Sequence, residues 1–409
     1  MRKRKIVNDP VYGFISINNE LIFELMEHPY FQRLRHIKQL GLTEMVYPGA
    51  LHTRFHHALG AVHLMGKTLE TLRHKGVEIT DGELEAAQAA ILLHDIGHGP
   101  FSHTLEETLL QQVHHESLSY LFMQSLNRQL NGALDLALQI FRNSYSRKFF
   151  HQLVSSQLDV DRLDYLRRDC FFTGVVEGSI GVERIIDMLH VHNDQIVVEE
   201  KGIYSIEHFL NARRLMYWQV YLHKTSVSAE RMLVNIVKRA QYLAQSGEKL
   251  VASDALKFFL KTNATLADFQ EKPTFLKTYG QLDDHDLWGA IKIWKDHRDP
   301  ILSSLCQMLL HRNLFQINLT TEPIGKEKID RLRTLVTQQF KTLRSDAAYF
   351  FSYGTLTNEA YMAENKAIMV LTKRGKVVDI AQASDLPNIK AMSKIVKKNY
   401  VCWPKNVSL

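Results

Sequence analysis

A chain of 409 residues, 45% of them hydrophobic, has the composition of an ordinary soluble globular protein with a substantial core. No stretch reaches the roughly 20 uninterrupted apolar residues that a membrane span needs, so no membrane association is expected. The basic start of the chain runs into Asn8, Asp9 and Pro10 rather than an apolar segment, which argues against a secretory signal. Three widely separated cysteines without CxxC spacing indicate reduced thiols and a cytoplasmic protein. The formal net charge of +6 fits either a mildly basic protein or one that attracts polyanions, and charge alone does not separate the two.

Most of the chain is predicted to be helical, because apolar residues recur at helical spacing and glycine and proline are few. In chain order, the expected helices cover residues 21–40, 83–98, 115–127, 205–244 and 329–343. Asp81 is the expected cap of the second helix, and Gly97, Gly99 and Pro100 end it. Segments with strand composition are scarce and cover residues 195–199, 349–353, 367–372 and 377–380. These elements predict a mainly α protein with a helical domain over residues 1–320 and a small α+β appendage over residues 321–409.

Histidines gather in one part of the chain, with ten of them between residues 52 and 115. Four histidine and aspartate residues stand out in segments predicted to be helical: His57, His94, Asp95 and Asp161. Imidazole and carboxylate ligands from separated helices are how the interior of a helical bundle holds a metal ion. Such mixed ligands suit a divalent Zn, Fe, Mn, Ni or Co ion better than calcium. Because four protein ligands leave open positions only in five- or six-coordinate geometry, octahedral Mn, Fe, Ni or Mg is favoured over tetrahedral Zn.

The pair of His94 and Asp95 lies in the stretch LLHDIGHGPFSH over residues 92–103, which makes it a far more specific signal than a His-Asp pair alone. With His57 and Asp161, this stretch resembles the HD-domain superfamily of metal-dependent phosphohydrolases. Within that superfamily it most resembles the deoxynucleoside triphosphate triphosphohydrolases, including the sterile-alpha-motif and HD-domain type. Further similar stretches are residues 31–35 (FQRLR), 37–41 (IKQLG), 47–50 (YPGA), 54–55 (RF), 159–165 (DVDRLDY), 168–170 (RDC) and, more thinly, 221–224 (YLHK).

The resemblance implies an HD-domain helical bundle with a metal-site core over about residues 30–230. Because the match begins almost at Met1, we expect no sterile-alpha-motif domain. The implied metal ligands are the four residues already named. The residues implied around the scissile phosphate are His98, His103 and His115, with Glu116 as their acidic partner. Those implied to hold phosphate oxygens are Arg54 and Arg162, and those facing the deoxyribose are Gln39, Tyr165 and Asp169.

The resemblance also implies regulation by an activating nucleotide at a subunit interface. The matching positions are Lys5, Asn8, Gln32 and Arg35, while Glu27 stands where the family usually has Asp. A homo-oligomer, either a dimer or a tetramer, is therefore expected.

Two stripes of side chains at helical spacing carry further predictions. Asp161, Tyr165 and Asp169 fall at i, i+4 and i+8 and share one helical face, whereas Asp159 and Asp164 fit a solvated acidic face. The second stripe consists of Arg213, Tyr217, Tyr221 and Lys224. It could stack on a base and hold a triphosphate tail, although a core helix with snorkelling cations explains the spacing too. In the resembling family this helix lines the nucleotide pocket, and Tyr217 replaces one of its histidines.

The leading functional prediction is hydrolysis of a dNTP to deoxynucleoside and inorganic triphosphate, with one divalent metal ion as cofactor. A second reading keeps the site but changes the substrate to a nucleoside monophosphate, a cyclic nucleotide or an alarmone. A third is a nucleic-acid-binding protein with a vestigial site. The intact ligand set and the lack of a basic run with interleaved aromatics argue against it. A purely structural bundle leaves the gathering of histidines, arginine and carboxylates unexplained.

Overall fold

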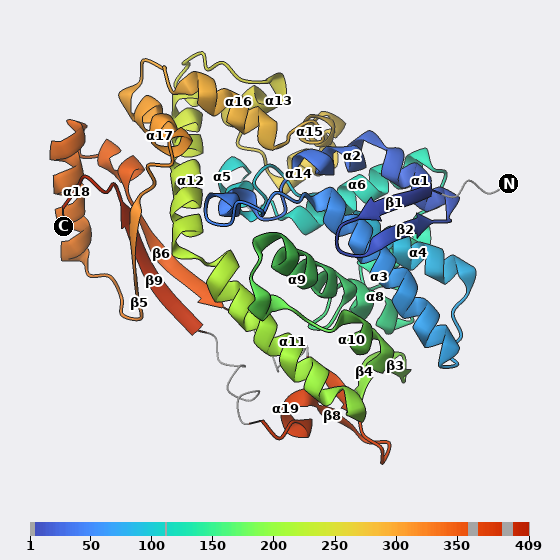
Figure 1. Ribbon diagram of the computed structural model, residues 1–409. Helices are drawn as coiled ribbons and strands as arrows, with labels where there is room; N and C mark the ends of the chain where they lie inside the picture. The colour runs from blue at the N-terminus through green and yellow to red at the C-terminus, as the bar shows by residue number, and fades with distance from the viewer. Residues whose placement is uncertain (1–4, 111–112, 359–366, 387–395, 409) are drawn as a thin grey trace.

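The computed structural model describes residues 5–110, 113–358, 367–386 and 396–408, without the side chains of His103 and Glu107. Within this part the protein is mainly α with small sheets, as predicted (Figure 1). The helices up to residue 188 are α1 (Glu20–Glu27), α2 (Pro29–Gln32), α3 (Arg54–His74), α4 (Asp81–Leu93), α5 (His103–Leu109), α6 (His115–Gln129), α7 (Asp135–Phe141), α8 (Lys148–Val154), α9 (Val160–Thr173) and α10 (Val182–Met188). The later helices are α11 (Ile203–Met216), α12 (Lys224–Gln245), α13 (Asp254–Lys261), α14 (Leu266–Glu271), α15 (Pro273–Tyr279), α16 (Asp284–Trp294), α17 (Pro300–Leu310), α18 (Lys326–Phe340) and α19 (Ile380–Ala383).

The strands form three small sheets among the described residues. The strands are β1 (Lys5–Asp9), β2 (Gly13–Ile17), β3 (Leu189–His192), β4 (Gln195–Glu199), β5 (Gln316–Thr320), β6 (Ser352–Asn358), β7 (Met369–Leu371), β8 (Val377–Asp379) and β9 (Val396–Trp403). β1 and β2 make an antiparallel hairpin, β3-β4-β7-β8 a four-stranded sheet, and β5-β9-β6 a three-stranded sheet. The expected strands at residues 195–199, 367–372 and 377–380 are present, while the hairpin, β3, β5 and β9 were not predicted. The strand expected at residues 349–353 is wrong in its first part, because a 3-10 turn ends at Phe350 and β6 begins only at Ser352.

The helical body is built around α3, which packs against both α4 and α9. A capping box begins α3: the Thr53 side chain and the His56 imidazole bond each other's backbone N–H groups. The helix then buries apolar side chains such as Leu59, Val62 and Leu69. Figure 1 shows α12 standing between this body and the sheet that contains β5, β6 and β9. Among the described residues, no helix combines the length and the apolar character that crossing a membrane requires.

Two predicted helices are shorter or more broken than expected. The helix predicted over residues 83–98 ends at Leu93, and its cap is Thr80 rather than Asp81. The helix predicted over residues 205–244 is interrupted by a π-helical turn at Tyr217–Tyr221 before α12 starts. Single π turns inside helices often lie at functional sites.

The helix predicted over residues 21–40 is also divided. His28 adopts an extended backbone conformation with ψ 138°, as a residue before proline commonly does, and Pro29 then starts a new helix. A 3-10 turn at Arg33–His36 follows. The boundary predicted at residue 320 separates β5 from its partner strand β9, and the division into two domains stays a prediction.

Candidate metal centre and active site

The metal-ligand candidates come from three helices that meet at one point. His57 lies in the first turn of α3, His94 and Asp95 directly follow α4, and Asp161 lies in the first turn of α9. His57 Nε2 and His94 Nε2 lie 3.0 and 3.4 Å from the same oxygen, Asp161 Oδ1. Asp95 closes the group, with its Oδ1 3.3 Å from His94 Nε2 and its Oδ2 3.9 Å from His57 Nε2. Ligand atoms held about 2.1 Å from one ion have this mutual spacing.

The chemistry of these side chains fits a divalent cation. The Nε2 atoms of His57 and His94 are buried and make no hydrogen bond within the described structure, although they face carboxylates. Burial by itself lowers the pKa of His57, but the carboxylates of Asp161 and Asp164 raise it to about 10. Burial likewise raises the pKa of Asp161, yet contacts with the two imidazoles hold it below its usual range. A bound cation would satisfy these atoms and balance the negative charge.

A second layer of contacts orients both imidazole ligands. His57 Nδ1 contacts Asp164 Oδ2 at 2.7 Å, and His94 Nδ1 contacts the Ile91 carbonyl at 2.6 Å. Each contact fixes the ring so that Nε2 points toward the cation position. Asp164 was expected on a solvated face, but it is fully buried beneath α3. Asp159 was expected there too, but it is buried and accepts from the backbone N–H groups of Ser156 and Arg162 at the start of α9.

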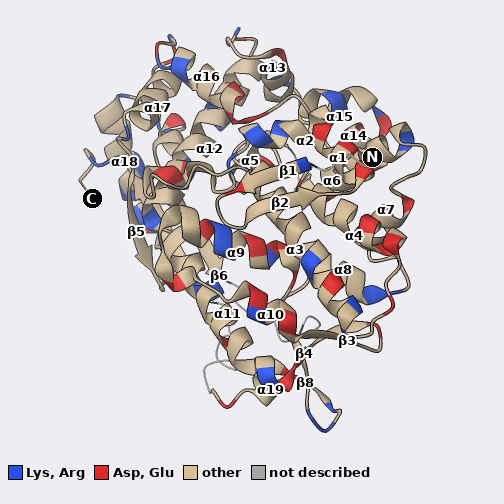
Figure 2. Ribbon diagram, turned by 45° about the vertical axis from the view of Figure 1, so that its right-hand side comes forward, with Lys and Arg blue, Asp and Glu red and all other residues tan. Residues whose placement is uncertain are grey.

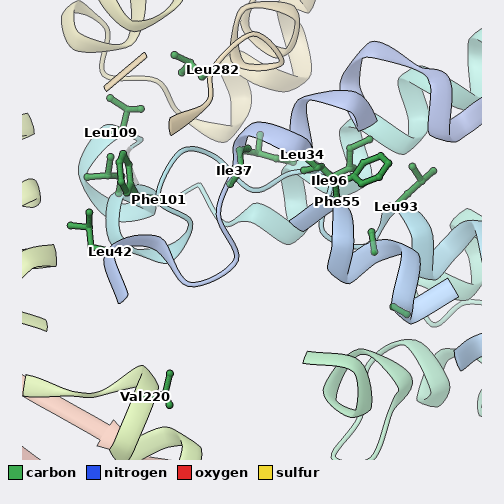
Figure 3. Packing of buried hydrophobic residues seen from close by; sticks show 14 of the residues in the cluster. Leu34, Ile37, Leu42, Phe55, Leu93, Ile96, Phe101, Leu109, Val220 and Leu282 are labelled. Carbon is green, nitrogen blue, oxygen red and sulfur yellow. The ribbon is translucent and has the colours of Figure 1, made fainter. Parts of the chain in front are cut away.

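The loop that carries His94 and Asp95 is held by distant elements, which explains why α4 ends early. The His94 carbonyl accepts from Ser119 Oγ at 2.6 Å, and the same hydroxyl accepts from Gly97 N–H at 2.9 Å. Arg33 donates to the Ile96 carbonyl at 2.7 Å. Backbone groups that would continue the helix are therefore bonded to other parts of the fold. Figure 3 shows Leu93 and Ile96, on either side of the ligand pair in sequence, among buried side chains of the core.

Two histidines of the predicted catalytic set lie beside the ligands. The rings of His98 and His115 stack with centroids 3.8 Å apart. His98 Nε2 lies 3.3 Å from Asp95 Oδ1. His98 reaches the site from the loop after α4 and not from the helix predicted over residues 83–98. Burial, followed by the Arg54 guanidinium, lowers the pKa of His98 well below its usual value. The ring is therefore neutral near pH 7.

The acidic partner of His115 differs from the predicted one. Glu106 on α5 accepts from the His115 backbone N–H at 2.7 Å and lies 3.1 Å from its Nδ1. Glu116 is exposed on α6, because the preceding residue and not Glu116 faces the site. No sequence signal separated the two glutamates, since Glu106 lies nine positions before His115. The predicted His103 begins α5, and its side chain lies outside the described atoms.

Arg54 stands at the rim of the ligand group. It is buried, donates Nη1 to Asp95 Oδ2, and donates Nε to Ser102 Oγ at 2.8 Å. Ser102 has a positive φ of 51°, a conformation uncommon for a non-glycine residue and frequent at functional sites. The loop is anchored by Asp284, which accepts from Phe101 N–H at 2.8 Å and from Lys38 N–H at 2.9 Å. Asp284 carried no signal in the sequence.

Comparisons with known proteins place this geometry in a family. An HD-domain model matches residues 54–169, and an HD-associated region matches residues 180–272. The chain is 33% identical to the uncharacterised protein YwfO of Bacillus subtilis, over 100% of this chain and 94% of YwfO. It superposes with a TM-score of 0.95 on a solved phosphohydrolase from Bacteroides thetaiotaomicron, at 52% identity over 98% of this chain and 100% of that one. The chain belongs to the HD-domain phosphohydrolase superfamily.

A more distant relative of this HD-domain protein has a named activity. Human deoxynucleoside triphosphate triphosphohydrolase SAMHD1 is 26% identical over 80% of this chain and 57% of the human protein. The matched HD segment starts at Arg54 and ends at Asp169. It therefore contains all four metal-ligand candidates and the whole predicted stripe of α9.

That stripe extends from the metal centre of the HD domain along one face of α9. Tyr165 follows Asp161 by one turn and packs edge-on against Tyr221 with centroids 6.1 Å apart. Asp169 follows by another turn, and its carboxylate is held by His52 Nε2 at 2.7 Å and by the Tyr221 hydroxyl at 2.8 Å. His52 was one of the gathered histidines but was given no role.

The two remaining candidates near α9 are partly engaged. Arg162 donates Nε to the Ser156 carbonyl at 2.7 Å and lies 3.5 Å from the Tyr165 hydroxyl. Gln39 donates its backbone N–H to the His52 carbonyl at 3.0 Å. Its side-chain oxygen is buried and makes no hydrogen bond within the described structure, so it is able to accept one from a ligand.

The second predicted stripe, over residues 213–224, is divided by the π turn between α11 and α12. Arg213 donates to Gln157 at 2.9 Å and lies over the Tyr217 ring, which packs edge-on against Tyr221 at 5.3 Å. These residues therefore form one cluster next to α9. Lys224 is exposed at the start of α12 and lines a separate hollow of about 220 Å³.

The residues predicted for an activating nucleotide lie near the start of the chain, on β1, at the end of α2 and in the 3-10 turn that follows it. Lys5 of β1 contacts Glu27 at 2.5 Å. Arg35 donates to Gln32 at 2.7 Å. Asn8, also on β1, is exposed. Figure 2 shows acidic and basic residues interspersed along the helices and strands rather than gathered on one element.

Proposed function

We propose that this HD-domain protein hydrolyses dNTPs to deoxynucleoside and inorganic triphosphate. The observation that carries the proposal is the Asp169 carboxylate, fixed by His52 and Tyr221 on the same helical face as the ligand Asp161. A fixed acceptor two turns along α9 from the ligand Asp161 suits the 3′-hydroxyl of a deoxyribose. Tyr165 lies between the two aspartates, where its ring would crowd a 2′-hydroxyl. The name of the human relative is consistent with this substrate class.

The proposed reaction adds water to the α-phosphorus and breaks its bond to the 5′-oxygen. A divalent ion held by the four ligands would neutralise phosphate charge and acidify water. Arg54 and Arg162 hold phosphate oxygens with their guanidinium groups. In this proposal His98, stacked on His115, takes the proton from water, and His115, next to Glu106, gives a proton to the departing 5′-oxygen.

We also propose that a nucleotide bound near Lys5, Asn8, Gln32 and Arg35 activates the protein and favours a dimer or tetramer. The pairs formed by Lys5 with Glu27 and by Arg35 with Gln32 offer both cations and acceptors to a nucleotide. Lys224, near Arg312 and Lys405, offers a further cationic surface outside the catalytic cluster.

The test is a product assay with purified protein loaded separately with Mn, Mg, Fe, Co, Ni or Zn. Each dNTP and NTP is offered alone and in mixtures, and inorganic triphosphate is measured. The proposal expects triphosphate from dNTPs with wild type and with Asp254→Ala, an exposed control, and none with Asp161→Ala. Release of phosphate only from monophosphates, cyclic nucleotides or alarmones would keep the HD chemistry and reject the substrate. Salt-dependent oligonucleotide binding without any turnover would favour a nucleic-acid-binding role instead.

A further inference from the structure

A chain of buried charges runs from the N-terminal hairpin to the metal ligand His57. Arg168 on α9 bonds two aspartates with its guanidinium. On one side, Nη1 and Nη2 lie 2.8 and 3.4 Å from the two oxygens of Asp9, at the end of β1. On the other side, Nε and Nη2 lie 2.9 and 3.0 Å from the two oxygens of Asp164, which contacts His57 Nδ1. All four residues are at most 3% exposed.

Helix α3 has a glycine, Gly60, where the Asp164–Arg168 ion pair packs against it. Gly60 lies one turn beyond His57 on α3. A Cβ atom at Gly60 would lie 1.9 Å from Asp164 Oδ1 and 2.3 Å from Arg168 Nη2. Glycine in a helix interior is destabilising relative to alanine. The missing side chain therefore has a packing reason, which is the space that the Asp164–Arg168 pair occupies.

The far end of the chain of charges also shapes the hairpin. Asp9 Oδ1 accepts from the backbone N–H groups of Val11 and Tyr12, at 2.9 and 3.0 Å, in the turn between β1 and β2. The ring of Tyr12 lies against the Arg168 guanidinium, 5.6 Å from its centre. One carboxylate thus fixes both the turn of the hairpin and one side of Arg168. A shift of the hairpin would move the guanidinium that holds Asp164.

We propose that Arg168 is a positioning residue that ties the β1–β2 hairpin to His57, so that the hairpin sets the affinity of the metal centre. Asp9 holds Arg168, Arg168 holds Asp164, and Asp164 fixes the ring of His57. If these buried ion pairs were merely structural, breaking them would alter unfolding and leave metal binding unaltered. The proposal goes beyond the substrate assignment and requires only the metal centre.

The experiment measures metal affinity in three variants and two matched controls. Arg168→Lys keeps the charge and loses the two-sided fork, Asp9→Asn keeps an acceptor for the turn, and Gly60→Ala intrudes on the ion pair. Arg167→Lys changes the neighbouring arginine, which also lies over Tyr12, and Gly66→Ala changes a glycine of the same helix that faces only the movable Gln88 amide. Mn²⁺ and Co²⁺ are titrated under chelator buffering, with metal analysis and the visible Co²⁺ spectrum as readouts. Thermal unfolding of the metal-free proteins is recorded alongside.

We expect the three variants to bind both ions about tenfold more weakly, which is the lower end of the losses seen for outer partners of metal ligands. The Co²⁺ band should shift in the variants and remain unchanged in both controls. The Asp9→Asn, Arg168→Lys double variant should bind no more weakly than Arg168→Lys alone, because the two residues act in series. If Gly60→Ala does not fold, the other two variants decide the result. Variants that bind metal within twofold of the controls, or losses that simply add in the double variant, would overturn the proposal. Because no nucleotide enters the assay, this result is independent of whether dNTPs are the substrate.

Discussion

The hydroxyl of Ser119 donates to the carbonyl of His94 at 2.6 Å, which joins α6 to the loop that carries two metal-ligand candidates. The same hydroxyl accepts from Gly97 N–H, so Ser119→Ala leaves two buried backbone groups without this partner. We expect a loss of about 2 kcal/mol in the free energy of unfolding. Urea unfolding of metal-free protein measures it, with the half-buried Ser117→Ala on the same helix as control. Equal stabilities of the two variants would contradict the anchoring role.

Tyr221→Phe removes the hydroxyl that holds Asp169 and leaves the ring in place. We expect kcat/KM for dNTPs to fall about tenfold, which corresponds to roughly 1.4 kcal/mol of lost transition-state binding. Metal content should stay unchanged, because Tyr221 contacts no ligand candidate among the described residues. Steady-state kinetics with dNTPs and metal analysis measure the two effects. Tyr204→Phe, at a 72% exposed position, is the control and should behave as wild type.

His98→Ala removes the neutral imidazole that stacks on His115. We expect kcat to fall by roughly 10²–10⁴, the usual contribution of a positioned acid or base, with metal retained. The matched control is His74→Ala, an exposed histidine at the end of α3. Single-turnover hydrolysis with each metal measures the chemical step. A variant that keeps wild-type kcat would remove His98 from the reaction.

Asp284 predicts a specific pH dependence of stability. Burial raises the pKa of Asp284 from 3.8 to about 6 in the folded protein. Between these values the folded state keeps a proton that the unfolded state has released, so the contribution of Asp284 to stability falls as pH rises from about 4 to about 6. Relative to Asp284→Asn, wild type should lose up to about 3 kcal/mol across this window. Urea unfolding at several pH values compares the two proteins, and a constant difference would reject the shifted pKa.

Arg35→Ala tests the proposed activating site. The variant loses the cation that lies 3.5 Å from the Phe55 ring centre and donates to Gln32. We expect nucleotide-induced activation and assembly to disappear while the unstimulated rate stays the same. Rates with mixed nucleotides, together with sedimentation of the protein with and without them, measure this. Activation equal to that of wild type would place the activator elsewhere or remove it.

Local patterns predicted the parts of the site that local chain geometry determines. Asp161, Tyr165 and Asp169 share a face because α9 is a regular helix, and helical spacing alone foretells that. Asp164 is buried against Arg168, and helical spacing alone predicts that these two residues are neighbours, since they are four positions apart. Arg168 in turn binds Asp9, which is 159 positions away in sequence. A local pattern does not reveal the second partner.

The end of α4 and the partner of His115 escaped prediction for the same physical reason. The backbone groups after Leu93 are bonded by Ser119 and Arg33, which belong to other elements. Glu106 and Glu116 are the same type of residue, and only the packing of α5 against the site decides between them. The resemblance assigns residues by their positions in the sequence, whereas these contacts arise from tertiary structure.

The middle position of β9 in its sheet has a consequence for how the protein is made. β5 and β6 both pair with β9 and not with each other. During synthesis, β5 therefore has no partner strand until residues 321–395 and then β9 have been added. Pairing between strands so far apart in sequence forms slowly. Until then β5 and β6 present open strand edges to neighbouring chains. A nascent chain halted before Val396 should consequently aggregate, even with the residues of the metal centre already synthesised.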